Sequence, residues 1–263
     1  MEIAEHIDAL SRQGDLLAGA AERAGLDASV PPCPSWQVKD LLRHTGYVHR
    51  WAARHVTECP DTVLDGPPEP DILRGGAADP DLLAWFRAGH AALVKTLSTA
   101  DPGLVCATFI DAPSSLAFWA RRQAHETAIH RADAESAAGV RPAYPAEFAA
   151  DGIDELIMGF GQRRKYRPSA EYNGSMQVRT TDTGHAWRVG TEEGRIQARR
   201  DQAGPDPEGP DPEGPAKCTV TGPASGLYLF LWNRSDAARA SVTISGDTGF
   251  LESWQSSVRV RWG

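Results

Sequence analysis

The first half of the chain repeats apolar residues at a spacing of three to four, which is typical of amphipathic helices. Ile3, Ile7, Leu10 and Leu17 show this spacing in the first such stretch. Four long helices are predicted, at about residues 3–25, 35–51, 79–97 and 113–138. Because each has an apolar stripe, they predict a four-helix bundle, a fold that often carries metal ligands on its inward faces.

Residues that favour helix ends mark the limits of these segments. Ser35 is the expected N-cap of the second helix, and Asp79 followed by Pro80 is expected to open the third. Gly139 is the expected stop of the fourth helix. Residues 60–79 are rich in Gly, Pro and Asp, and are predicted to form a long loop.

In the second half of the chain the apolar period changes from helical to alternating. Met176 and Val178, and then Trp187 and Val189, alternate with polar residues, as strands with one buried face do. Further strands are expected at residues 196–198, 218–221 and 242–244, helices at 148–160 and 224–232, and hairpin turns at 182–184 and 192–194. The sequence therefore predicts two domains: a bundle at residues 1–142, and a smaller α+β domain with an antiparallel sheet at 146–263.

A short repeat interrupts the second half. The sequence Pro-Asp-Pro-Glu-Gly occurs at residues 205–209 and again at 210–214. The repeat has no apolar residue, so it cannot contribute to a core. We expect a mobile acidic loop between two strands, at residues 203–216.

Composition and charge exclude several classes of protein. A net charge of −8 argues against nucleic acid as a main partner, because phosphate binding needs a basic surface. No apolar run approaches the ~20 residues of a membrane span, and no apolar signal segment follows Met1. The four cysteines are scattered without a Cys-x-x-Cys pair. We expect a cytoplasmic protein with reduced thiols, as a monomer or homodimer.

The candidate chemistry lies on the fourth predicted helix. Glu126 and His130 are four residues apart, so their side chains share one helix face. His44 lies beside the apolar stripe of the second helix and could supply a third ligand. Two imidazoles and a carboxylate leave one position of a zinc ion open, as catalytic sites do. From spacing alone, Glu126 and His130 could equally form a simple hydrogen bond, and His125 is a rival ligand that points about 100° away from Glu126.

Four segments resemble motifs of known families. Residues 34–44, PSWQVKDLLRH, resemble a signature of DinB-like metal-binding bundles. Residues 121–133, RRQAHETAIHRAD, resemble the second signature of the mycothiol-dependent maleylpyruvate isomerase family. Residues 151–156 and 220–234 are similar to the start and the C-terminal motif of the second domain of that family. The resemblance covers nearly the whole chain.

This resemblance implies a fold, a metal and a thiol. The implied fold is a DinB-like bundle followed by a sterol-carrier-like α+β domain. His44, Glu126 and His130 match the family's ligands for zinc or another divalent metal, and the open position would receive the sulfur of mycothiol, an actinobacterial thiol. An arginine-rich, lysine-poor composition, typical of a GC-rich genome, agrees with such a host.

The resemblance also implies roles for three further residues. Arg234 matches an arginine that assists binding of the anionic substrate or thiol, and is therefore the candidate catalytic and cofactor-binding residue. A helix-terminal arginine can instead simply stabilise the helix dipole. Arg122 and Asp133 are candidates to orient Glu126 and His130, with ordinary salt bridging as the alternative.

Three functions are compatible with these observations. The first is a zinc enzyme that uses mycothiol, either for cis–trans isomerisation of a maleylpyruvate-like unsaturated acid or for S-transfer to a small electrophile. The second is a metal-dependent hydrolase, for which Asp133 is the remaining acidic candidate for a base on that helix face. The third is a non-catalytic stress or ligand-binding protein that contains a structural metal.

Overall fold

A computed structural model of the protein describes residues 1–163, 166, 174–201 and 216–260. The chain divides into two compact units, Met1–Pro142 and Ala143–Arg261. The predicted acidic loop, at residues 203–216, lies outside the described residues except for Ala216. Within the described part of the chain, no helix is both long enough and apolar enough to cross a membrane.

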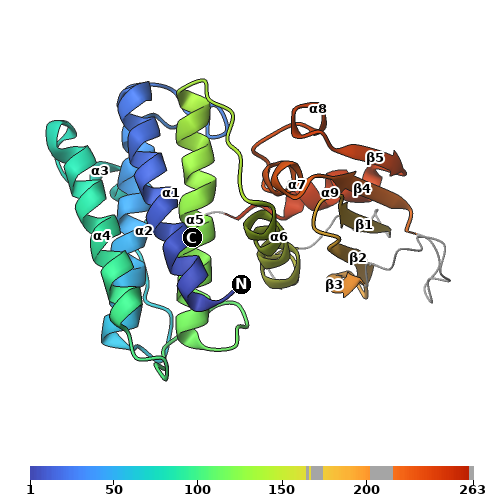
Figure 1. The fold of residues 1–263 in the computed structure, drawn as a ribbon, viewed down its shortest axis with the longest axis horizontal. Coiled ribbons are helices and arrows are strands. Elements are labelled where there is room, and N and C mark those ends of the chain that lie inside the picture. The colour runs from blue at the N-terminus through green and yellow to red at the C-terminus, as the bar shows by residue number, and fades with distance from the viewer. Residues whose placement is uncertain (164–165, 167–173, 202–215, 261–263) are drawn as a thin grey trace. The chain divides into compact units, whose positions relative to one another are not determined.

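The first unit is the predicted four-helix bundle (Figure 1). Its long helices are α1 (Ile3–Ala24), α2 (Val38–Glu58), α4 (Leu82–Thr99) and α5 (Ser115–Ala137). Helix α1 packs mainly against α5, and α2 packs mainly against α4. The loop predicted at residues 60–79 contains one short helix, α3 (Glu69–Arg74), and a 3-10 turn, η1 (Asp79–Asp81), begins at its last residue and leads into α4.

The core of the bundle consists of the apolar stripes read from the sequence. Leu10 and Leu17 of α1, Leu41 of α2 and Phe86 of α4 are fully buried. Each such side chain contributes roughly 1.5–3 kcal/mol through removal of apolar surface from water. Helix α5 differs from the others because charged residues such as Asp133 are buried on it as well. Buried charges need partners, and these partners build the site described below.

The start of α2 differs from the prediction. Ser35 is not the N-cap; the helix begins at Val38, with Gln37 as its cap residue. The carboxylate of Asp40 accepts a hydrogen bond from the backbone N–H of Gln37 at 2.9 Å. This contact satisfies an N–H group that the first turn leaves without a helical partner, so it fixes the helix start two positions beyond the expected one.

The second unit is an α+β fold around a five-stranded sheet of order β3-β2-β1-β4-β5. The strands are β1 (Ser175–Thr180), β2 (Ala186–Glu192), β3 (Arg195–Asp201), β4 (Cys218–Gly222) and β5 (Thr243–Gly246). The helices are α6 (Ala146–Asp154), the π-helical η2 (Glu155–Phe160), α7 (Ala224–Leu231), α8 (Ala237–Ala240) and α9 (Gly249–Ser257). The predicted α+β class is confirmed.

The sheet is mixed, whereas the sequence predicted an antiparallel one. Strand β1 pairs with β2 in the antiparallel direction but with β4 in parallel. Strand β4 joins the sheet beside β1, so β1 and β2 lie between it and β3, and it runs in the same direction as β1. The alternation of buried Cys218 and Val220 is the same for either direction of a strand, so it predicts the strand but not its direction.

The hairpin between β2 and β3 follows its predicted turn. Glu192 pairs with Arg195, so the turn consists of Glu193 and Gly194. Both have positive φ, 50° and 72°, as a type I′ hairpin turn requires.

Candidate metal centre

The structure brings together the three residues predicted as metal ligands. One ligand atom each from His44, Glu126 and His130 lies within 4.8 Å of the other two. Nε2 of His130 is 3.1 Å and Nε2 of His44 is 3.6 Å from the same oxygen, Oε1 of Glu126. The two imidazoles, from α5 and α2, thus converge on one carboxylate oxygen.

Two charged side chains of α5 bind the atoms of His130 and Glu126 that face away from the convergence point. The carboxylate of Asp133 accepts a hydrogen bond from Nδ1 of His130 at 2.9 Å. Nη2 of Arg122 donates to Oε2 of Glu126 at 2.9 Å. The bond to Asp133 leaves Nε2 as the nitrogen of His130 that faces Glu126. These contacts are compatible with both sequence-based interpretations of Arg122 and Asp133, orientation of Glu126 and His130 and ordinary salt bridging.

Burial and charge shift the pKa values within this group in opposite directions. Burial lowers the pKa of His44, against the hydrogen bond with Glu126. Burial alone would raise the pKa of Glu126, but hydrogen bonds from His130 and His44 outweigh it and hold this pKa well below its usual range. Burial would also lower the pKa of His130, yet the hydrogen bonds to Asp133 and Glu126 raise it to about 9.

Trp36 completes the surroundings of the two histidines, and the sequence analysis assigned it no role. Its ring centroid lies 4.9 Å from that of His44, and it stacks on His130 at 6.2 Å with an interplanar angle of 26°. The indole is 9% exposed. The one sequence signal was its position inside the segment 34–44, which also contains His44.

The donor set fits a divalent metal ion such as zinc. Two imidazole nitrogens and one carboxylate oxygen, close together and mostly buried, are ligands that zinc accepts. A histidine whose second ring nitrogen binds a carboxylate is the usual arrangement around protein-bound metals, and Asp133 supplies that carboxylate. His44, Glu126 and His130 would therefore hold the ion.

Two other residues considered from the sequence are placed differently. The ring of His125 packs on that of His6 of α1 at 6.1 Å, so His125 faces another side of α5 than Glu126 does. Arg234 belongs to the second unit, where it follows α7. Its backbone N–H donates to the carbonyl of Leu229, and Nη1 donates to that of Trp232 at 2.9 Å. These contacts terminate α7, and the role of Arg234 at the site stays a prediction.

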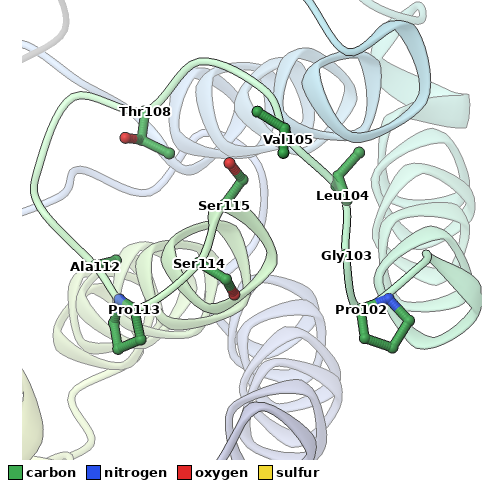
Figure 2. A pocket seen from close by; sticks show the side chains of 9 residues that line it. All are labelled: Pro102, Gly103, Leu104, Val105, Thr108, Ala112, Pro113, Ser114 and Ser115. Carbon is green, nitrogen blue, oxygen red and sulfur yellow. The ribbon is translucent and has the colours of Figure 1, made fainter.

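A separate cavity of about 370 Å³ lies at the start of α5 (Figure 2). It is lined by residues 102–105, 108 and 112–115. These residues include no titratable side chain, and none is a candidate ligand. This cavity therefore offers no candidate metal ligand and no acid–base group.

Comparisons with known proteins agree with the fold and with the sequence motifs. The family model of the mycothiol maleylpyruvate isomerase N-terminal domain matches residues 7–135, and that of the C-terminal domain of the same family matches residues 147–253. No curated protein sequence matches this chain.

Two solved structures are similar over almost their whole length. One is a mycothiol-dependent maleylpyruvate isomerase, with 13% identity and a TM-score of 0.61. The other is a histidine-to-alanine mutant described by the same name, with 13% identity and a TM-score of 0.62. In both comparisons the match covers 94% of this chain and 95% of the other. At this identity the likeness establishes the fold, and the two domain matches establish the relationship. The chain therefore belongs to the mycothiol maleylpyruvate isomerase family.

Proposed function

We propose that this protein is a mycothiol-dependent enzyme with a divalent metal, most simply zinc, held by His44, Glu126 and His130. The reaction is either cis–trans isomerisation of a maleylpyruvate-like unsaturated acid or S-transfer to a small electrophile. Family membership supports an enzyme. The observation that carries the metal assignment is the convergence of two imidazoles and one carboxylate within 4.8 Å.

Some side chains of the cluster would bind the metal, and others orient those ligands. When bound, zinc would favour the thiolate form of mycothiol, and addition and loss of that thiolate at a conjugated double bond would let the bond rotate. Asp133 fixes the ring of His130, and Arg122 fixes the carboxylate of Glu126. Trp36 packs against both imidazoles. In S-transfer the thiol adduct would be released instead.

The contacts favour a thiol reaction over hydrolysis. A hydrolase needs a general base near the attacking water. Asp133 is fully buried and hydrogen-bonded to His130, and Glu126 is bonded to Arg122 and His130. Both carboxylates are thus engaged in holding the cluster. Since the reaction requires a reduced thiol, we expect it to take place in the cytoplasm.

Spectroscopy of the cobalt-substituted protein tests this proposal. Anaerobic purification and metal analysis should give about one divalent ion per chain, and titration with mycothiol should produce a thiolate-to-cobalt charge-transfer band. His44→Ala, Glu126→Ala and His130→Ala should each lose the metal while keeping helical circular dichroism. His125→Ala is the matched control, since it lies on the same helix and should keep the metal. Full metal retention in the His44 or His130 variant would exclude this ligand set.

A further inference from the structure

Three aromatic rings form a closed contact group beside Glu126. The centroids of His44 and His130 lie 5.0 Å apart with an interplanar angle of 72°, and the indole of Trp36 contacts both rings. Glu126 lies at the Nε2 side of the two imidazoles. Each histidine ring therefore lies between the carboxylate and a neighbouring aromatic surface.

Trp36 is itself held firmly by the loop before α2. Its backbone N–H donates to the carbonyl of Cys33 at 2.8 Å, and its carbonyl accepts from the N–H of Val30 at 3.0 Å. Val30 is fully buried and belongs, with Trp36, to the apolar core shared by α1, α2 and α4. Because both its backbone and its ring are fixed, the indole is a rigid surface for the imidazoles.

The two ligand histidines differ in how they are oriented. Nδ1 of His130 is bonded to Asp133, which sets the rotation of that ring. His44 comes from a different helix and has the indole packed at 4.9 Å against its face. A rotation of the His44 ring would drive it into the indole or away from Glu126. Packing of this kind reduces the number of rotamers that a ligand can adopt before the metal arrives.

We propose that Trp36 is a positioning residue of the candidate metal centre, which holds the rings of His44 and His130 in the orientation that lets both Nε2 atoms face Glu126. This inference rests on the proposed metal site. It assigns the indole an effect on metal affinity that is separate from its share in the core of the bundle.

Substitution of two tryptophans with similar burial separates these effects. Trp36→Leu removes the ring beside the ligands, whereas Trp36→Phe keeps an aromatic surface. The matched control is Trp51→Leu, since Trp51 is 8% exposed, belongs to the same helix as His44, and contacts the rings of His55 and Trp119. Zinc affinity is measured by chelator competition, at a temperature where circular dichroism shows every variant folded.

Trp36→Leu should weaken zinc binding ten- to hundredfold, the range found for groups that orient metal ligands. Trp36→Phe should recover most of this loss, and Trp51→Leu should stay within about twofold of the unchanged protein. Equal affinities in Trp36→Leu and the unchanged protein would overturn the inference. An equal loss in Trp51→Leu would do the same, because it would assign the effect to general destabilisation.

A measurement without metal distinguishes failure of this inference from failure of the metal assignment. Long-range ¹H–¹⁵N spectra of the metal-free protein report the imidazole rings directly. We expect one sharp set of signals for His44 and His130 in the unchanged protein and in Trp51→Leu, and broadened or doubled signals in Trp36→Leu. If the unchanged protein binds no zinc and still gives this pattern, the positioning role stands and the metal assignment fails. Unchanged signals in Trp36→Leu would remove the positioning role.

Discussion

His130 makes the stability of the metal-free protein depend on pH. Hydrogen bonds to Asp133 and Glu126 outweigh burial and raise its pKa from 6.5 to about 9. The protonated ring therefore stabilises the fold fully below about pH 6.5, and this contribution is lost as the pH rises through 9. The shift corresponds to roughly 3 kcal/mol. Burial lowers the pKa of His44, so His44 titrates below this window.

Urea unfolding of chelator-treated protein between pH 6 and 9.5 measures this effect. The free energy of unfolding should fall across the window in the unchanged protein and stay nearly flat in His130→Gln. A metal ion must displace the same proton, so zinc binding near pH 7 should release about one proton, measurable by calorimetry in buffers of different ionisation enthalpy. A flat stability profile in the unchanged protein would show that His130 is neutral without metal.

Arg234 is the residue whose role the sequence suggested and the contacts leave as a prediction. Arg234→Met should keep the metal, because the candidate ligands all belong to the bundle unit, and should weaken thiol or substrate binding. Loss of one charge-assisted hydrogen bond costs ~1.5–3 kcal/mol, or roughly ten- to hundredfold in affinity. Arg234→Lys should recover part of this, since a point charge replaces a planar fork.

The control is Arg239→Met, which removes an exposed arginine of α8 paired with Asp236. Binding constants for mycothiol, measured by calorimetry on metal-loaded protein, should be unchanged in this variant. The same affinity in Arg234→Met would exclude Arg234 from thiol and substrate binding.

At the scale of single elements, α1 depends on a glycine where it meets α4. A Cβ atom at Gly14 would lie 2.1 Å from Nε2 of His90, whose ring is buried and bonded to the carbonyl of Leu10. Gly14→Ala should therefore destabilise the fold by about 1–3 kcal/mol through overpacking. Gly19→Ala, on the same helix, would meet only the end of the Arg23 side chain at 3.4 Å. It should be neutral or stabilising by up to about 1 kcal/mol.

Chemical denaturation of the two variants gives this comparison directly. A Gly14→Ala protein as stable as the unchanged one would mean that α1 and α4 can separate enough to admit a methyl group.

The sequence predicted well the elements that depend only on residues close together in the chain. The long helices follow from apolar spacing along one segment, and Glu126 and His130 meet because both lie on α5. The start of α2 was predicted wrongly because Ser35 and Gln37 are both polar residues that can precede a helix. The bond from the N–H of Gln37 to Asp40 decides between them, and spacing alone does not reveal it. The short helix α9 was not predicted, although Phe250, Leu251 and Trp254 have helical spacing and are buried.

The contacts that the sequence could not predict join segments far apart in the chain. Alternation in β4 does not specify β1 as its parallel partner, since both directions bury Val220 equally. Trp36 lies before α2, so no helical spacing relates it to His130, and only the folded loop of residues 28–38 brings the indole there. Spacing placed His44 beside the apolar stripe of its own helix, but only the family motif related it to Glu126 and His130.

At the scale of the whole molecule, the division into two units predicts where the metal is bound. All three candidate ligands lie within Met1–Pro142. A protein of residues 1–142 should therefore fold, bind zinc with an affinity close to that of the full chain, and turn over thiol poorly. The chain from residue 143 onward should bind no zinc. Metal analysis of both products checks this, and a metal-free bundle would show that the second unit contributes a ligand.

The packing of α1 against α5 has a consequence for folding during synthesis on the ribosome. The first helix to be synthesised finds its main partner only when the last helix of the bundle has emerged, whereas α2 and α4 can pair earlier. At about 5–20 residues per second, the face of α1 that packs on α5 stays uncovered for several seconds, whereas its smaller contact with α4 can form earlier. Nascent chains that stop short of residue 115 should therefore be held by chaperones, and release should coincide with the emergence of α5.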